Sequence, residues 1–129
     1  MKNGHREEVL LKELAPPLSH YVHAVRHDGM LFISGLVGLD AEMTVVGDDV
    51  STQTDRILHD MRRILKRFEA DLSAVLRVTV YVTDIADRAA INEVRKRHFG
   101  AARPASTLVE VSALVLPELK VEIEAIAAI

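Results

Sequence analysis

Cysteine is absent from the chain, and its aromatic residues are limited to three phenylalanines and two tyrosines. Without cysteine the protein has no disulfide, no thiolate metal ligand and no cysteine nucleophile. This composition suits a reducing compartment, so we expect a cytoplasmic protein. Proteins that stack nucleic-acid bases need aromatic platforms. Five scattered aromatic side chains provide no evident platform of that kind.

An excess of basic charge is also missing. Lysine and arginine total 16 against 19 aspartates and glutamates, which gives a net charge of −3. A nucleic-acid binder normally shows a basic face, so we expect no nucleic-acid partner. No apolar run is long enough to span a bilayer, and we expect no membrane association. Residues 1–8 do not contain the apolar core of a signal peptide.

The remaining composition is that of an ordinary globular domain. The 129 residues are 49% hydrophobic and 27% charged, which fits one domain with a real core. We place this single domain at residues 18–129. Residues 1–17 are predicted to be a peripheral N-terminal segment, which ends at Pro16-Pro17 because neither proline offers a backbone donor.

A β-hairpin is predicted at the start of the domain. Residues 19–25 and 30–34 read as strands, and Asp28-Gly29 between them is a strong hairpin signal. Ser34-Gly35 is predicted to end the second strand. Glycine at that point permits either a close approach of the backbone or a turn with positive φ. Residues 36–46 suggest further irregular strand, with a turn at 40–44.

An amphipathic helix follows. Thr52-x-x-Asp55 resembles a capping box and is predicted to begin the helix. The opposite side is polar and is predicted to be solvated, with Arg56, Asp60, Arg63 and Arg67. The apolar residues recur at the spacing of one helical stripe and are Ile57, Leu58, Met61, Ile64, Leu65 and Phe68.

The second half of the chain predicts a strand at residues 75–83, a helix and two more strands. The helix is capped by Asp84 or Asp87 and ends at Gly100. Residues 103–111 and 119–126 read as the last strands, and Glu122 and Glu124 lie on one side of the final strand. This order predicts an α+β domain with both helices on one face of a mixed sheet. Subunit association is the natural cover for the other face.

Several stretches resemble the RidA/YjgF family, small enamine and imine deaminases long labelled "endoribonuclease L-PSP". Residues 104–111 and 121–127, Pro-Ala-Ser-Thr-Leu-Val-Glu-Val and Val-Glu-Ile-Glu-Ala-Ile-Ala, are similar to its C-terminal signature. Residues 19–25, 31–35, 79–84 and 87–99 resemble four further family segments, in the family's order. The resemblance covers roughly residues 15–129. It implies a chorismate-mutase-like fold and a homotrimer. In that trimer the sheets form an inner barrel, the helices lie outside, and ligand clefts sit at subunit interfaces.

The resemblance also implies a site for a small acid. Glu122 is the candidate catalytic residue, since a carboxylate can hold and activate the water that hydrolyses an imine. Ser34, Gly35, Tyr21 and Asn92 occupy the family's substrate-binding positions. Each also has a plain structural reading: Tyr21 as a packed strand residue, Ser34-Gly35 as a turn, and Asn92 as a cap or surface group.

Ser106 stands where the family usually carries an arginine, with Glu122 expected on the partner strand. A guanidinium forks onto a carboxylate with two charge-assisted bonds, whereas Ser106 offers one hydroxyl. We therefore expect weak or absent activity on 2-iminopropionate. Arg88 and Arg95 take positions that are commonly aromatic in the family. We interpret their side chains as solvated; the alternative is that one of them supplies, from the second helix, the positive charge that Ser106 does not provide.

The histidines do not form a metal-binding constellation, so we predict no metal and no cofactor. His20 and His23 flank Tyr21, and by strand parity at least one of them could approach a cleft, although single histidines near a turn are more often surface groups. The leading functional hypothesis is an enamine or imine hydrolase with an altered substrate range, for which the aminomuconate deaminases of the wider family are one model. The alternatives are a trimeric protein that binds a metabolite without turnover and, third, an endoribonuclease or translation inhibitor.

Overall fold

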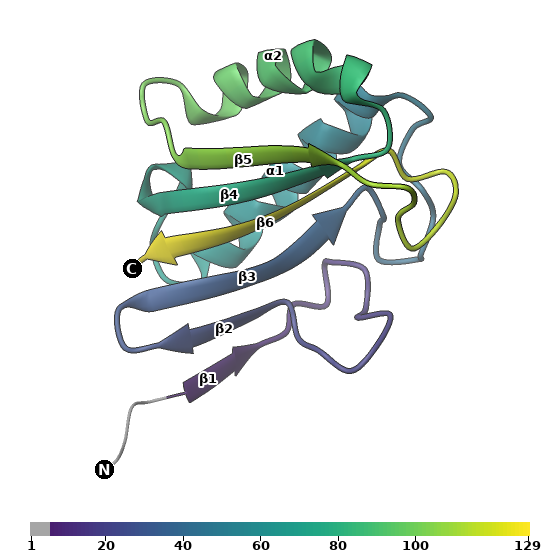
Figure 1. The fold of residues 1–129 in the computed structure, drawn as a ribbon. Helices are drawn as coiled ribbons and strands as arrows, with labels where there is room; N and C mark the ends of the chain where they lie inside the picture. Colours follow the sequence, from purple (N-terminus) through teal and green to yellow (C-terminus); the bar gives the residue numbers. More distant parts are fainter. Residues whose placement is uncertain (1–5) are drawn as a thin grey trace.

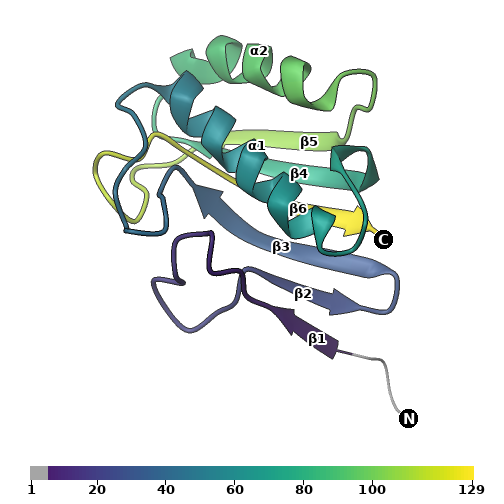
Figure 2. The same ribbon diagram turned by 180° about the vertical axis from the view of Figure 1, so that it is seen from behind.

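The computed structural model describes residues 6–129 as a six-stranded sheet with two helices packed on one face (Figure 1). The view from behind shows both helices on that same face (Figure 2). The predicted α+β class is confirmed. The strands are β1 (Arg6–Val9), β2 (Ala24–His27), β3 (Met30–Val37), β4 (Val75–Val82), β5 (Ala105–Glu110) and β6 (Val121–Ala128), and the helices are α1 (Val50–Lys66) and α2 (Arg88–Phe99).

The strand order is β1-β2-β3-β6-β4-β5, with β4 and β5 parallel and the other pairs antiparallel. The strand β4 therefore separates β5 from β6. Ser106 pairs with Val78, which in turn pairs with Ala125. The expectation that Glu122 lies on the partner strand of Ser106 is wrong, because the chain inserts its last strand into the middle of the sheet.

The first hairpin differs from its prediction at both ends. The turn at Asp28-Gly29 is confirmed, and Asp28 has a positive φ of 53°. The strand β2 begins only at Ala24, because residues 19, 20 and 23 are bends and residues 21–22 have no regular structure. The strand β3 does not end at Ser34-Gly35 but continues to Val37 through a register shift.

The helix α1 begins earlier than the sequence suggested. Asp49, not Thr52, is its N-cap, and its carboxylate accepts the backbone N–H of Thr52 at 3.0 Å. The apolar stripe is confirmed: Ile57, Leu58, Met61, Ile64 and Leu65 are all buried against the sheet, and Phe68 packs at the edge of the core.

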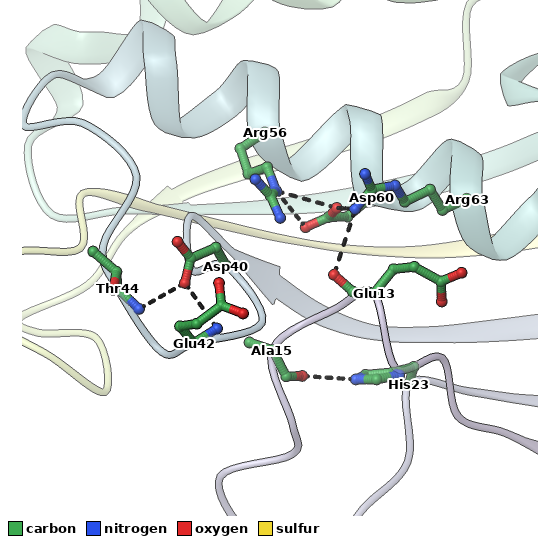
Figure 3. A network of polar contacts seen from close by, with 9 residues as sticks. All are labelled: Glu13, Ala15, His23, Asp40, Glu42, Thr44, Arg56, Asp60 and Arg63. Carbon is green, nitrogen blue, oxygen red and sulfur yellow. Dashed lines mark hydrogen bonds and ion pairs between the residues drawn. The ribbon is translucent and has the colours of Figure 1, made fainter.

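Asp60, predicted on the solvated face of α1, is only 2% exposed. Its carboxylate pairs with Arg56 at 3.1 Å and with Arg63 at 3.3 Å (Figure 3). Arg63 also donates to the carbonyl of Glu13 at 3.4 Å, so the N-terminal segment covers this part of the helix. A buried carboxylate needs such partners because an unpaired charge in the interior is costly.

The second helix follows its prediction closely. Asp84 caps a short 3₁₀ turn by accepting the N–H of Ala86, and α2 begins directly after Asp87. Ile91 and Val94 are buried against the rest of the core. Gly100 ends the helix with a positive φ of 61°, the conformation that glycine adopts without strain.

The core lies between the helices and the inner face of the sheet. It extends beyond the boundary predicted at residue 17, because Val9 and Leu14 are both buried in it. Residues 1–5 of the predicted peripheral segment lie outside the described residues. Both helices of residues 6–129 lie on one face of the sheet, and on the opposite face Phe32 is 47% exposed. Across residues 6–129, no helix combines the length and apolar character needed to cross a membrane.

Candidate functional site

Four of the predicted site residues line one hollow of about 410 Å³ on the open side of the sheet. They are Tyr21, Ser34, Gly35 and Glu122. The strands β3 and β6 form its floor, and the segment before β2 forms a wall. The other lining residues are Leu18, Ser19, Val37, Val115 and Glu124.

A β-bulge shapes the floor of this hollow. The ladder between β3 and β6 pairs Ile33 with Ala125 and then Leu36 with Ile123. Two residues of β3, Ser34 and Gly35, therefore oppose the single residue Glu124. Bulges bend a strand and re-aim its side chains, and they are common next to active sites.

Gly35 is required here by close approach and not by its backbone angles. It is absent from the residues with positive φ. A Cβ at position 35 would overlap Oε2 of Glu122 and lie 2.8 Å from its Cδ. Of the two uses of glycine that the sequence left open, the structure shows close approach: the Glu122 carboxylate lies directly over the Gly35 backbone.

Glu122 and Glu124 form a carboxylate pair on β6. Burial raises the pKa of Glu122, and the charge of Glu124 raises it further. Tyr81 on β4 donates its hydroxyl proton to Oε2 of Glu124 at 2.9 Å, and this hydrogen bond raises the pKa of Tyr81. Glu124 thus has a fixed partner, while the half-buried Glu122 presents its carboxylate to the hollow.

The wall of the hollow is residues 10–22, here called the strap. Ser34 donates its hydroxyl proton to the carbonyl of Val22 at 2.6 Å, which ties the strap to β3. Within the strap, the Tyr21 hydroxyl accepts the N–H of Leu18 at 3.2 Å. Tyr21 is 43% exposed and is not the packed strand residue of the alternative reading.

The His23 side chain forms hydrogen bonds with the backbone of the strap, although its sequence context suggests a surface group. It is 4% exposed. Its Nδ1 accepts the N–H of Leu11 at 3.0 Å, and its Nε2 lies 2.8 Å from the carbonyl of Ala15 (Figure 3). Because Nδ1 accepts a hydrogen bond, Nε2 is the nitrogen that donates to the carbonyl of Ala15. No sequence signal distinguishes this histidine from the exposed His20.

A second, narrow hollow lies behind Ser34 and Gly35. Its lining includes His23 and the buried Asp60. Burial raises the pKa of Asp60, and the hydrogen bond and charge of Arg56, together with the charge of Arg63, oppose that shift. Asp60 therefore lines the narrow hollow and is not among the residues that line the larger one.

The other two predicted residues lie elsewhere. Asn92 on α2 and Ser106 on β5 line a separate hollow on the helix side of the sheet. Ser106 pairs with the buried Val78, whereas Glu122 pairs with Tyr81 on the open face. Paired residues share a face, so Ser106 and Glu122 lie on opposite faces of one sheet. A single chain does not bring the full predicted set together. Within residues 6–129, no group of three or more His, Asp or Glu side chains is placed to hold a metal ion.

The sequence and the fold are both similar to those of known proteins. The profile of the family described as Endoribonuclease L-PSP matches residues 12–129. Reactive Intermediate Deaminase A, a chloroplastic protein of Arabidopsis thaliana, is 38% identical over 124 residues, which are 95% of this chain and 66% of that protein. The 3-aminoacrylate deaminase RutC of Acinetobacter baylyi is 35% identical over 94% of this chain and 97% of its own length. The crystal structure of RidA from an Antarctic Psychrobacter superposes with a TM-score of 0.90 at 27% identity, covering 95% of this chain and 99% of that one.

Proposed function

The chain belongs to the Endoribonuclease L-PSP family, in which RidA and RutC deaminases are its relatives, and from that premise we propose that it hydrolyses an enamine or imine to a carbonyl compound and ammonia. The observation that carries this proposal is the half-buried Glu122 carboxylate, which lies over Gly35 in an open hollow.

In this reaction Glu122 acts as the general base. A water molecule held by its carboxylate adds to the carbon of the C=N bond while Glu122 takes the proton. Glu122 then returns that proton to the nitrogen of the carbinolamine, the C–N bond breaks as the C=O bond forms, and ammonia leaves with the proton of the hydroxyl group as ammonium. An enamine enters the same route after protonation at carbon. A base works best when its pKa approaches the working pH, and burial moves the pKa of Glu122 in that direction.

The carboxylate pair also suits the electrophile. A protonated imine is a cation, and two adjacent carboxylates favour a cation over its neutral form. Glu124 is held in place by the Tyr81 hydroxyl, so its charge stays next to Glu122. Tyr21, on the wall of the hollow, is placed to orient a substrate by its ring and hydroxyl.

We propose that the protein acts as a homotrimer with its substrate sites between subunits. Two observations support this assembly. The open face of the sheet exposes large apolar side chains, including Phe32 (47%) and Val109 (39%). In addition, Asn92 and Ser106 lie apart from Glu122 in one chain, so the predicted site becomes complete only where two chains meet. Light scattering should give three times the chain mass at micromolar concentration, and a monomer mass would refute the interfacial site.

Ammonia release is the test of the proposed reaction. Freshly generated 2-iminopropionate, 3-aminoacrylate and 2-aminomuconate are offered to the wild type, Glu122→Gln and the exposed matched control Glu118→Gln. The proposal expects turnover of at least one substrate by the wild type and Glu118→Gln, and a loss of about a hundredfold or more in Glu122→Gln. Binding of these compounds without turnover by the wild type would instead favour a metabolite-binding protein.

A further inference from the structure

One buried polar side chain, Gln53 on α1, has no part in the proposed reaction. It is fully buried. Its Oε1 accepts the backbone N–H of Lys120 at 2.8 Å, and its Nε2 donates to the carbonyls of Glu118 at 3.0 Å and Gly47 at 3.2 Å. These partners use both donors of the amide and one lone pair of its oxygen, and the reverse orientation would place donor against donor. The amide therefore has one favourable orientation.

Gln53 joins two loops that lie at the same end of the sheet. Gly47 belongs to the loop that leads into α1, and Glu118 and Lys120 belong to residues 111–120, here called the β5–β6 loop (Figure 1). Among the hydrogen bonds of residues 6–129, only the one from Gln53 to Glu118 ties residues 112–119 to another element. The polar attachment of the middle of the β5–β6 loop therefore depends on one side chain.

The β5–β6 loop supplies part of the wall of the hollow that contains Glu122. Val115, near the middle of the loop, lines this hollow together with Leu18 and Val37. Val115 is 57% exposed, so burial within the chain does not fix its side chain. A loop that becomes ordered only when a ligand binds reduces the affinity by its ordering entropy. A loop that is held in place beforehand avoids most of that cost.

We propose that Gln53 is a positioning residue, which holds the β5–β6 loop so that Val115 covers the substituent of a bound substrate. Glu122 and Glu124 lie on β6, which is paired with both β3 and β4, so the two carboxylates stay in place without the Gln53 amide. Loss of that amide frees the loop alone. The consequence is weaker binding, a higher KM and an unchanged kcat.

The test uses two stable cations in place of a protonated imine, methylammonium and n-butylammonium. Their binding is measured by nuclear magnetic resonance titration of the full chain labelled with ¹⁵N. Only n-butylammonium carries a chain that Val115 can cover. The variants are Val115→Ala, Gln53→Met, which has a similar volume without the hydrogen bonds, and Gln53→Glu, which keeps the shape and the acceptor for Lys120.

Thr54→Val is the matched control. Thr54 is the next residue of α1 and is also fully buried. Its hydroxyl donates to the carbonyl of Val50 at 2.7 Å, one turn earlier on the same helix. This variant therefore removes a buried hydrogen bond from α1 without touching the β5–β6 loop.

We expect the wild type and Thr54→Val to bind n-butylammonium about tenfold or more tightly than methylammonium, since each covered methylene contributes about fourfold. In Gln53→Met this preference should fall below about threefold, while methylammonium binds as it does to the wild type. Gln53→Glu should show the same change at a smaller size. The Lys120 amide should exchange with solvent about tenfold or more faster in Gln53→Met and at the wild-type rate in Thr54→Val.

Val115→Ala should also lower the preference for n-butylammonium, and it does so at an exposed position that folding does not require. The double variant of Gln53→Met and Val115→Ala should lose no more than the larger single loss, because both changes act on one wall. Equal weakening of both cations in Gln53→Met, an unchanged preference in Val115→Ala, or a wild type without the preference would each overturn the proposal.

The inference rests on the proposed function in treating the hollow as the substrate site, yet the two can fail separately. A preference that depends on Gln53 in a protein that deaminates nothing supports the positioning role and refutes the reaction. Turnover with the same KM in the wild type and Gln53→Met, together with an unchanged preference, refutes the positioning role and leaves the reaction standing.

Discussion

Replacing Gly35 with alanine should remove activity while leaving the fold intact. The added Cβ would overlap Oε2 of Glu122 and lie 2.8 Å from Cδ and 3.0 Å from Cγ. These three nearest atoms all belong to the flexible side chain of Glu122, so we expect the carboxylate to move aside and the backbone to stay. Gly35 has no positive φ, and alanine fits its backbone without strain.

The two effects have different sizes. Alanine restricts the unfolded chain and stabilises a compatible site by about 0.4–1 kcal/mol, which offsets part of the cost of moving Glu122. We therefore expect the free energy of unfolding to change by less than about 1 kcal/mol. A catalytic group misplaced by about 1 Å costs roughly a hundredfold in rate. The Gly35→Ala protein should thus show near-normal denaturation and a kcat lowered by about that factor.

Two other glycines provide the controls. A Cβ at Gly38 would lie 3.0 Å from the Cβ and 3.2 Å from the Cα of the buried Gln53 on α1, so a helix backbone would have to shift. Gly38→Ala should cost about 1–3 kcal/mol of stability and keep its rate per folded molecule. Gly29→Ala meets no atom closer than 3.5 Å and should change neither property. A Gly35→Ala protein with the wild-type kcat would refute the placement of the Glu122 carboxylate over Gly35.

Three further predictions concern the hydrophobic core, the strap and the position of Ser106. Leu65→Ala should cost about 2–5 kcal/mol in chemical denaturation because Leu65 is fully buried, and an unchanged midpoint and slope would contradict its place in the core. His23→Ala should lower the free energy of unfolding by about 2–4 kcal/mol because two hydrogen bonds are lost, whereas His20→Ala at an exposed position should leave it unchanged. Equal denaturation midpoints for the two variants would show that the His23 ring does not stabilise the strap. The release of ammonia from 2-iminopropionate should be absent in the wild type, present in Ser106→Arg and absent again in Ser106→Arg with Glu122→Gln, and rapid wild-type turnover would contradict the expected effect of Ser106.

The elements with strong periodicity were predictable from the sequence. The stripe from Ile57 to Leu65 and the alternation around Glu122 follow local geometry, because side-chain spacing alone decides which face is buried. The prediction is wrong where groups distant in the sequence determine the local structure. The strand predicted at residues 19–25 begins only at Ala24, and the His23 side chain forms hydrogen bonds with backbone groups of the strap. Asp60 is buried because the N-terminal segment covers it, which no local pattern reveals.

The candidate site was predictable in part for the same reason. Tyr21, Ser34, Gly35 and Glu122 share one hollow, as the family resemblance implied. The relation between Ser106 and Glu122 depends on strand order, and no residue pattern shows that β4 separates them. The sequence alone also does not show why residue 35 is glycine, because glycine suits both a close approach of the backbone and a positive φ.

The most direct test of the account is the acidic limb of kcat/KM against pH in the wild type, Glu124→Gln and the exposed control Glu118→Gln. A general base must be ionised, so the rate should rise with pH through the pKa of Glu122. The negative charge of Glu124 raises that pKa, and its removal should move the limb to lower pH, with Glu118→Gln unchanged. A limb that stays in place in Glu124→Gln, or that persists in Glu122→Gln, would contradict catalysis by this carboxylate pair.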